Sequence, residues 1–232
     1  MNGILLFNKP ILWTSHDAVD FVRRRFGQRA VGHAGTLDPL ATGLLIILLG
    51  KATKRSDEFI GLDKDYRGTL TLGITTDTQD LEGKILESRD VENISEENIQ
   101  KVFQSLCGLK HQTPPNYSAA RVNGRKLYDW SRQGVRVQAK PREIQIFNFC
   151  LLNFFQTDIH FFVSCSKGTY IRSLCDEAGK RLGCGATLSS LVRTRIGPFI
   201  LKDALNIDDF EGHPGIRESG TRKPGYPELR IP

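Results

Sequence analysis

The chain has 232 residues, of which 39% are hydrophobic and 25% charged, and its formal net charge at pH 7 is +6. This composition excludes a disordered chain and allows one large domain or two small ones. The basic balance favours an anionic partner, with nucleic acid ahead of a membrane because no long amphipathic basic helix is evident. The longest uncharged apolar runs, ILLF and LLIILL, are too short to span a bilayer, and the first residues lack the pattern of a signal peptide. We therefore expect a cytoplasmic protein.

The N-terminal part predicts a strand, a helix, a loop and a second strand. The sequence GILLF at 3–7 is the first strand, and Thr14 or Ser15 caps a helix that extends to about Gly27. The Gly-rich stretch GHAGTLDPLATG at 32–43 predicts a tightly turned loop rather than a helix or a ladder strand. The uncharged run LLIILL that follows predicts a buried strand.

The next stretch predicts a strand, a turn and a helix. The sequence at 66–74 places Leu70, Leu72 and Ile74 on one face, which is typical of a half-solvated antiparallel strand. The sequence TTDTQDLEG after it is turn material. Ser95 then opens a helix whose apolar side chains recur at helical spacing.

The stretch at 112–142 differs from its surroundings, with little periodicity and two adjacent prolines. Its basic and aromatic residues are interleaved: Arg121, Arg125, Lys126, Arg132, Arg136, Lys140 and Arg142 with Tyr117, Tyr128 and Trp130. We expect a projecting basic segment, because these side chains suit phosphates and bases better than a core.

The last third of the chain predicts two strands, a helix and a final strand. Glu143 to Cys165 supplies two strands rich in Phe, Ile and Val, and Thr169 caps a helix that Gly183 ends. The sequence at 191–199 is a further strand. Strands mixed with segregated helices indicate an α+β fold with a largely antiparallel sheet.

The cysteines argue against disulfides and against a zinc site, because their number is odd and no CxxC pair occurs. They lie in apolar or helical surroundings at Cys107, Cys150, Cys165, Cys175 and Cys184. We expect reduced and mostly buried thiols.

Asp38 stands out because the Gly-rich stretch that carries it leads straight into the apolar run of a buried strand. An Asp before a Pro in a Gly-rich loop is most often turn chemistry, so a catalytic role needs further support. A phosphate-binding loop fails on spacing, since it needs a glycine five residues before Gly50 and position 45 is Leu. A metal site with His33 lacks a further ligand nearby in the sequence. The remaining interpretation is catalysis by one carboxylate acting on a nucleic acid.

Five motifs together resemble the TruB family of tRNA pseudouridine synthases: NKP at 8–10, GHAGTLDPLATGLL at 32–45, DKDYR at 63–67, SKGTYIRSL at 166–174 and LVRTRIGPF at 191–199. The resemblance covers most of residues 1–200 in the family's order. It implies the pseudouridine-synthase α+β fold, with helices flanking a mainly antiparallel central sheet. It implies isomerisation of uridine 55, in the T-loop of tRNA, to pseudouridine after base flipping. Residues 1–210 would be the catalytic domain, with 112–142 as its RNA-gripping thumb loop.

The resemblance makes Asp38 the nucleophile, Tyr66 the ring that stacks on the target base and Arg172 the cation that partners Asp38. A guanidinium nearby favours the charged form of a buried carboxylate and fixes its direction. Detaching uracil from C1′ and rejoining it through C5 needs no redox equivalents and no net water, so neither cofactor nor metal is expected. The resemblance also implies that His33 enters the RNA stack where the flipped base was, and that Tyr170 and Leu191 line the uridine pocket. Lys9 and Lys54 would contact phosphates, and Asp80 would have a supporting role.

The expected partner is the T stem-loop of tRNA, bound by a monomer without a protein partner or a membrane. Residues 211–232 are rich in Gly, Pro and charge, so we expect a poorly ordered tail and no appended C-terminal RNA-binding domain. One alternative is a non-catalytic tRNA-folding chaperone, and another is an RNA-guided synthase of the archaeal or eukaryotic type. The sequence leaves open whether Asp38 attacks C6, attacks C1′ or acts through a glycal-type intermediate.

Overall fold

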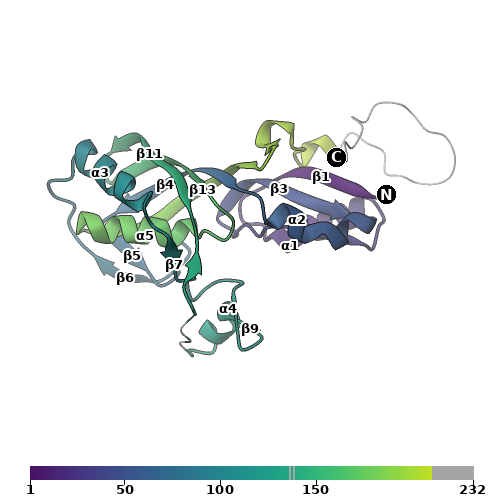
Figure 1. Cartoon of the computed structure of the whole chain (residues 1–232), viewed down its shortest axis with the longest axis horizontal. Coiled ribbons are helices and arrows are strands. Elements are labelled where there is room, and N and C mark those ends of the chain that lie inside the picture. The colour runs from purple at the N-terminus through teal and green to yellow at the C-terminus, as the bar shows by residue number, and fades with distance from the viewer. Residues whose placement is uncertain (136, 138, 211–232) are drawn as a thin grey trace. The chain divides into compact units, whose positions relative to one another are not determined.

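The computed structural model describes residues 1–210 with the exception of 136 and 138. The expectations for Arg136 and for the tail at 211–232 lie outside these residues. In the described part, five α-helices are mixed with strands whose pairs β1–β3, β2–β3, β4–β12 and β11–β12 are antiparallel (Figure 1). This confirms the expected α+β class.

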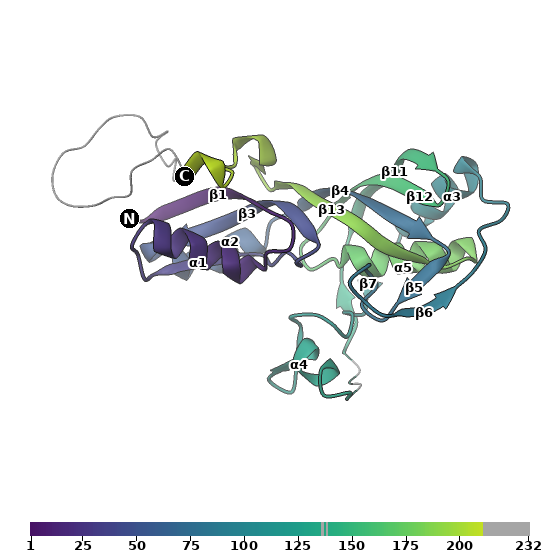
Figure 2. The ribbon, with the colours of Figure 1, turned by 180° about the vertical axis from the view of Figure 1, so that it is seen from behind.

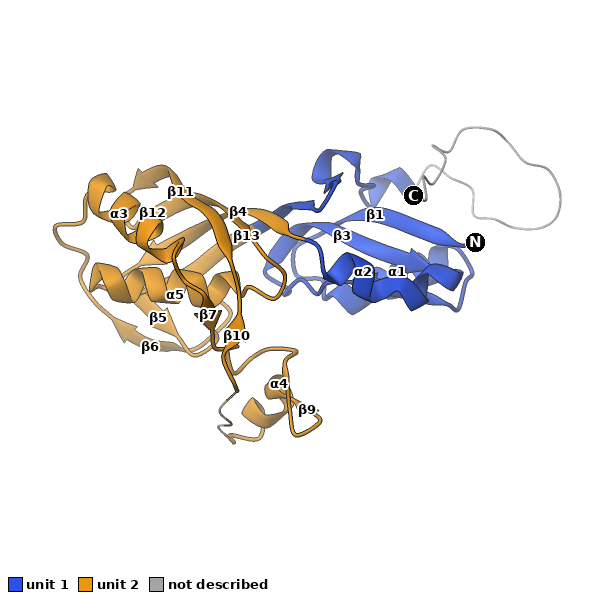
Figure 3. Cartoon of the chain, viewed as in Figure 1, with its two compact units in different colours: residues 1–62, 192–232 blue, residues 63–191 orange. Residues whose placement is uncertain are grey.

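The chain forms two compact units (Figure 3). The first consists of residues 1–62 and the chain from Val192 onwards, and the second consists of residues 63–191. Strand β13, Ala186–Ile196, contributes its first part to the second unit and its last part to the first.

The sheet of the first unit is built around β3, Ala41–Leu49. Strand β1, Gly3–Lys9, pairs with one edge of β3, and β2, Val31–Ala34, pairs with the other. The end of β13 pairs with β14, Phe199–Ile200. The helical elements of this unit are α1 (Ser15–Arg25), η1 (Gly50–Arg55), α2 (Ser56–Ile60), η2 (Leu201–Asp203) and η3 (Asp208–Phe210).

Side chains of β3 alternate between two apolar clusters. Leu45, Ile47 and Leu49 pack with α1, which lies against the sheet in Figure 2. The alternate residues of the same strand pack with η1, α2 and the end of β13. Because both faces of β3 are buried, the strand contains no charge, as the sequence predicted.

The Gly-rich stretch at 32–43 is a loop only at 35–40, since β2 takes its first residues and β3 its last. The expectation that it contains no ladder strand is therefore wrong at both ends. Gly43 has φ 99, and a Cβ there would lie 2.5 Å from the carbonyl oxygen of Arg193. Glycine is used here for close backbone approach within a strand, so it does not mark a turn.

The second unit contains a sheet in the order β13, β4, β12, β11. The strands and helices are β4 (Lys64–Leu72), β11 (Ile146–Phe155), β12 (Asp158–Cys165), α3 (Glu96–Leu106) and α5 (Ile171–Leu182). Helix α3 packs on both β11 and α5. The two predicted strands between Glu143 and Cys165 are thus confirmed.

Three of the predicted helix boundaries follow the capping rules, and a fourth does not. Thr14 caps α1 and Ser95 caps α3, each through a capping box, and Gly183 ends α5 at φ 87, as predicted. Thr169 does not cap α5. The N-cap residue is Tyr170, and the Thr169 hydroxyl donates to a carbonyl oxygen of the preceding turn instead.

The predicted turn after β4 contains a hairpin. Gly73, at φ 83, ends β4, so Ile74 starts a new strand, β5 (Ile74–Thr76), which pairs with β6 (Ile85–Ser88). Every residue of β6 is exposed. A strand without a buried face has no alternation to reveal it.

The segment at 112–142 projects from the rest of the second unit (Figure 3), as expected. Its base is the pair β7 (His111–Gln112) and β10 (Arg142–Glu143), and beyond lie β8 (Arg121–Val122), β9 (Arg125–Lys126) and α4 (Leu127–Ser131). Ala120, Leu127 and Ala139 form a small apolar core with two valines. The segment therefore has folded structure of its own.

Candidate active site

Asp38 lies half-buried in the loop between β2 and β3, and Ser15 fixes the residue before it. Ser15 is buried in the first turn of α1, donates its hydroxyl to the Leu37 carbonyl oxygen at 3.0 Å and accepts from the Leu37 N–H at 2.8 Å. One side chain thus satisfies both backbone groups of a buried residue.

Lys9 fixes the residue that follows Asp38. Its side chain is 0% exposed, and the ammonium donates to the carbonyl oxygens of Pro10 at 2.8 Å, Trp13 at 2.5 Å and Pro39 at 3.5 Å. A buried ammonium needs such acceptors because removing it from water is costly. The expected phosphate contact is therefore wrong for Lys9, which joins the Asp38 loop to the β1–α1 connection and exposes no surface to RNA.

Arg193 holds the start of the same loop, and the sequence analysis assigned it no role. Its side chain is 1% exposed and donates to the carbonyl oxygens of Leu44 at 2.8 Å, Gly35 at 3.0 Å and Thr36 at 3.4 Å. The sequence did contain a sign of this role. In the strand motif LVRTRIGPF, side chains alternate between two faces, so Arg193 lies on the same face as the apolar Leu191.

Buried donors therefore hold the backbone on both sides of Asp38. Ser15 holds the preceding residue, Lys9 the following one, and Arg193 the beginning of the loop. The backbone that carries the Asp38 carboxylate is thus fixed by the protein itself, which is how a preorganised site is supported.

His33 lies on β2, opposite Ile47 of β3, and is half-buried. Its Nδ1 atom is buried without a hydrogen-bond partner. Burial lowers the pKa of His33, and the nearby charges of Arg193 and His16 lower it further. The imidazole is thus neutral at pH 7 and offers a flat, uncharged ring.

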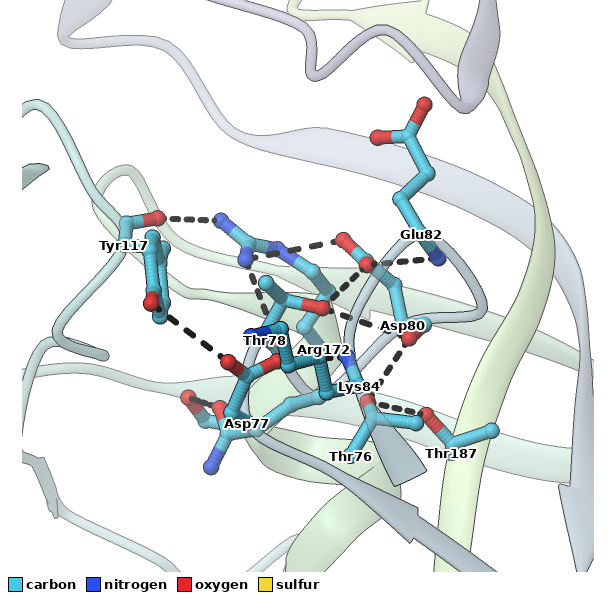
Figure 4. A network of polar contacts seen from close by, with 11 residues as sticks. Thr76, Asp77, Thr78, Asp80, Glu82, Lys84, Tyr117, Arg172 and Thr187 are labelled. Atoms are coloured by element: carbon cyan, nitrogen blue, oxygen red, sulfur yellow. Dashed lines mark hydrogen bonds and ion pairs between the residues drawn. The ribbon is translucent and has the colours of Figure 1, made fainter. Parts of the chain in front are cut away.

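Arg172 occupies the first turn of α5 in the second unit and is 5% exposed. Its guanidinium donates to the carbonyl oxygens of Thr78 at 2.7 Å and Tyr117 at 2.8 Å, and it lies 3.6 Å from an Asp80 carboxylate oxygen (Figure 4). One side chain thereby joins α5, the turn after β5 and the projecting segment.

Asp80 is buried beside Arg172 and has more partners than its expected supporting role suggested. Its carboxylate accepts from the Thr78 hydroxyl at 2.5 Å and from the Glu82 N–H at 3.2 Å, and Thr76 donates its hydroxyl to the Asp80 carbonyl oxygen at 2.7 Å (Figure 4). These bonds give the carboxylate a fixed direction toward the guanidinium.

The remaining predicted residues occupy different surroundings. Tyr66 is buried on β4, opposite Val163 of β12, and Leu191 is buried on β13. Tyr170 is half-buried at the N-cap of α5, where the buried Gln112 side chain pairs with both its N–H, at 2.8 Å, and its carbonyl oxygen, at 3.0 Å. Sequence reasoning missed Gln112, which had no neighbouring motif.

The predicted residues divide between the two units. Asp38 and His33 belong to the first, as does Lys54, which is exposed at the end of η1. Tyr66 and Arg172 belong to the second, with Tyr170 and Leu191. The pairing of Asp38 with Arg172 stays a prediction.

Two family models match the chain. The one described as the N-terminal domain of TruB family pseudouridylate synthase matches residues 23–171, and the tRNA pseudouridylate synthase B C-terminal domain matches 172–220. The chain belongs to the TruB family of pseudouridylate synthases. The resemblance inferred from the motifs is confirmed, and with it the assignment to an isomerase family. The second match includes α5 and β13 of the units described above.

Curated members of the TruB family are similar over most of the chain. The tRNA pseudouridine synthase B of Syntrophotalea carbinolica is 48% identical over 211 residues, which cover 91% of this chain and 69% of the relative. The tRNA pseudouridine synthase B of Opitutus terrae is 44% identical over 214 residues, which cover 92% of this chain and 89% of the relative.

Solved structures share the fold of this TruB family member. A Cbf5–Nop10–Gar1 complex contains a chain that matches with a TM-score of 0.70 and 28% identity, over 89% of this chain and 53% of that one. An H/ACA RNP bound to a substrate RNA containing 2′-deoxyuridine matches with a TM-score of 0.65 and 26% identity, over 89% and 51%. The chain spans about half the length of these neighbours. The likeness confirms the expected pseudouridine-synthase fold.

No group of three or more His, Cys, Asp or Glu among the described residues could hold a metal ion. No helix in that part of the chain is long and apolar enough to cross a membrane. All five cysteines are free thiols, three of them buried, and burial raises the pKa of Cys165 to about 12.

Proposed function

We propose that this TruB family member isomerises uridine 55 in the T-loop of tRNA to pseudouridine, with Asp38 as the nucleophile. The observation that carries the proposal is the Asp38 loop, whose backbone is held on both sides by the buried side chains of Ser15, Lys9 and Arg193. Turn chemistry alone does not require three buried side chains around one carboxylate. The names of the relatives support tRNA as the substrate class.

The reaction breaks the bond between C1′ and N1 of uracil and forms a bond between C1′ and C5, and the C5 proton leaves for N1 or solvent. Asp38 attacks C6 of the base or C1′ of the sugar, or acts through a glycal-type intermediate, and any bond that it forms breaks again before release, so the carboxylate is regenerated. The atoms balance without an oxidant, a reductant or net water.

The other residues act on the base and on the charge of Asp38. Arg172 supplies a fixed guanidinium for the carboxylate, and Tyr66 supplies a flat ring for a base turned out of its stack. His33, as a neutral ring, takes the place of that base in the RNA, and Tyr170 and Leu191 line its pocket. Lys54, which is exposed, binds a phosphate.

The test replaces Asp38 with Asn and measures tritium release from T-arm and whole tRNA labelled at C5 of uridine. Pseudouridine formation should be abolished while RNA affinity is kept, because the side chain keeps its shape. Asp90→Asn, at an exposed position, is the matched control. Turnover near wild type in Asp38→Asn would refute the assignment.

The role of Arg172 has its own test. Arg172→Lys keeps the charge but loses the planar fork, so activity should fall by orders of magnitude in a folded protein. An unchanged rate would show that the guanidinium has only a structural function.

A second candidate is a tRNA-folding chaperone, and the basic projecting segment at 112–142 favours it as an additional role. Such a role needs affinity but no carboxylate. Asp38→Asn separates the two, because a chaperone keeps its effect on tRNA folding in this variant.

As a monomer that grips only the T arm, the protein should modify the isolated stem-loop within about tenfold of whole tRNA.

A further inference from the structure

The connection between β1 and α1 presents two apolar side chains to solvent beside the Asp38 loop. Ile11 is 56% exposed and Leu12 is 73% exposed. Single exposed apolar residues are ordinary on soluble proteins, so exposure by itself indicates no function. The backbone of Leu12 provides a second, independent observation.

Leu12 has φ 67, in the left-handed region where a leucine is strained. The other non-glycine residues with positive φ in the described chain are Gln79, Asn93, Asn123 and Gln156. Leu12 is thus the one apolar residue in this group, and because its side chain is exposed, burial does not offset the backbone strain. A glycine would adopt this conformation without strain, so the retained side chain points to a function outside folding.

A hydrogen bond to the Asp38 loop holds the backbone of Leu12. The Leu12 N–H donates at 2.9 Å to the Pro39 carbonyl oxygen, which also accepts from Lys9 at 3.5 Å. Trp13 anchors the other end of the connection in the aromatic cluster of β1 and α1. The exposed pair is therefore fixed next to the residue that follows Asp38.

We propose that Ile11 and Leu12 form an apolar knob that packs against unstacked bases of the RNA loop beside the target uridine. The inference rests on the proposed function, since it takes Asp38 as the reacting group. Phosphates are poor partners for aliphatic side chains, whereas bases turned out of a loop expose apolar faces. Proteins that distort nucleic acids insert leucine and isoleucine between such bases.

The knob makes a contact whose strength does not depend on charge. A phosphate contact releases counterions, so its loss lowers the slope of log Kd against log salt concentration by about 0.7 to 0.9. Loss of an apolar contact weakens binding at every salt concentration by the same factor. The salt dependence therefore distinguishes the knob from the basic surface of the protein.

The test uses Leu12→Asn, alone and combined with Ile11→Ser. Asparagine tolerates the left-handed conformation, so the fold of the connection is kept. Leu86→Asn, on β6 and 64% exposed, is the matched control. Filter binding of a T-arm stem-loop RNA at several salt concentrations gives Kd and the salt slope, and turnover of the same RNA gives kcat and KM.

We expect the double variant to bind the T arm about five- to tenfold more weakly, as the loss of a partly buried apolar pair implies. The salt slope and kcat should stay unchanged while KM rises, and Leu86→Asn should behave as wild type. Unchanged affinity, or a slope lower by about 0.7 or more, would overturn the knob. If Leu12→Asn fails to fold, Leu12→Gly, which suits the backbone, gives the same measurement.

The outcomes separate this inference from the proposed function. A wild-type chain that binds the T arm and leaves its uridine unmodified overturns the proposed function, while the affinity of the variants still decides on the knob. A wild-type chain that does not bind this RNA overturns both.

Discussion

Replacing Ser15 with Ala tests whether the buried donors around Asp38 position the carboxylate. The substitution removes a single hydroxyl and leaves a good helix former in the first turn of α1. It deprives the Leu37 N–H and the Leu37 carbonyl oxygen of their partner, and Leu37 is buried.

The magnitude follows from the two backbone groups left without a partner. Each buried unsatisfied group costs about 1–3 kcal/mol, so two cost about 2–6 kcal/mol in a rigid loop, and partial relaxation brings the expected fall in the free energy of unfolding to about 2–4 kcal/mol. For a chain of this size, about 2–4 °C per kcal/mol lowers Tm by roughly 5–15 °C. Relaxation of the loop reduces this cost, and such relaxation also displaces Asp38.

The catalytic effect should exceed what the loss of stability explains. A displacement of about 1 Å at a reacting group costs on the order of 100-fold, so kcat on T-arm RNA should fall by about 10- to 100-fold below the melting transition. Kd for the RNA should stay within about twofold, because Ser15 is buried.

The control is Ser95→Ala, which removes the N-cap hydroxyl of α3 and costs about 1 kcal/mol without touching the Asp38 loop. It should lower Tm and leave kcat unchanged. If Ser15→Ala loses stability while kcat stays at the wild-type value, the hydrogen bonds to Leu37 do not position Asp38, and the reasoning is refuted.

Three further changes probe the same architecture. Gly43→Ala should lower the free energy of unfolding by more than about 3 kcal/mol in chemical denaturation, because its Cβ would lie 2.5 Å from the Arg193 backbone. The control is Gly27→Ala, which has φ +58 and open space around its Cβ and should cost only about 1 kcal/mol. Burial lowers the pKa of His33, so below about pH 6.5 the unfolded chain takes up a proton that the folded chain does not. The free energy of unfolding should therefore fall as the pH drops through that window. His33→Asn should flatten this dependence of Tm on pH. Asp80→Asn should cost about 3 kcal/mol in urea unfolding because it breaks a buried ion pair, and a cost below about 0.5 kcal/mol would contradict the geometry.

Elements with a buried face and a cap could be predicted from the sequence. Thr14 and Ser95 mark helix starts because their hydroxyls bind the first free N–H groups, and the alternation of β12 follows from one buried face. The exposed strand β6 and the Gly-containing strand β2 gave no such signal. Pattern reasoning detects burial, and these strands form through backbone pairing instead.

The candidate site divides in the same way. Asp38 could be singled out because its loop leads into an apolar run, and the resemblance of the motifs gave it a role that stays a prediction. The roles of Ser15 and Arg193 could not be inferred, because each binds carbonyl or N–H groups of a distant segment, and sequence does not show which backbone groups need a partner. Lys9 was misplaced for a related reason, since a lysine is normally a surface residue.

The buried cations also change what the net charge of +6 means for RNA binding. Lys9, Lys64, Arg172 and Arg193 are buried in the described part of the chain, and three of them donate to backbone carbonyl oxygens there. A buried cation with such partners releases no counterion when RNA binds, so it adds nothing to the salt dependence of affinity. The long-range attraction for RNA must therefore come from exposed basic side chains, of which the projecting segment at 112–142 carries several. Neutralising that segment should lower the salt slope, whereas replacing a buried cation should lower stability and leave the slope as it was.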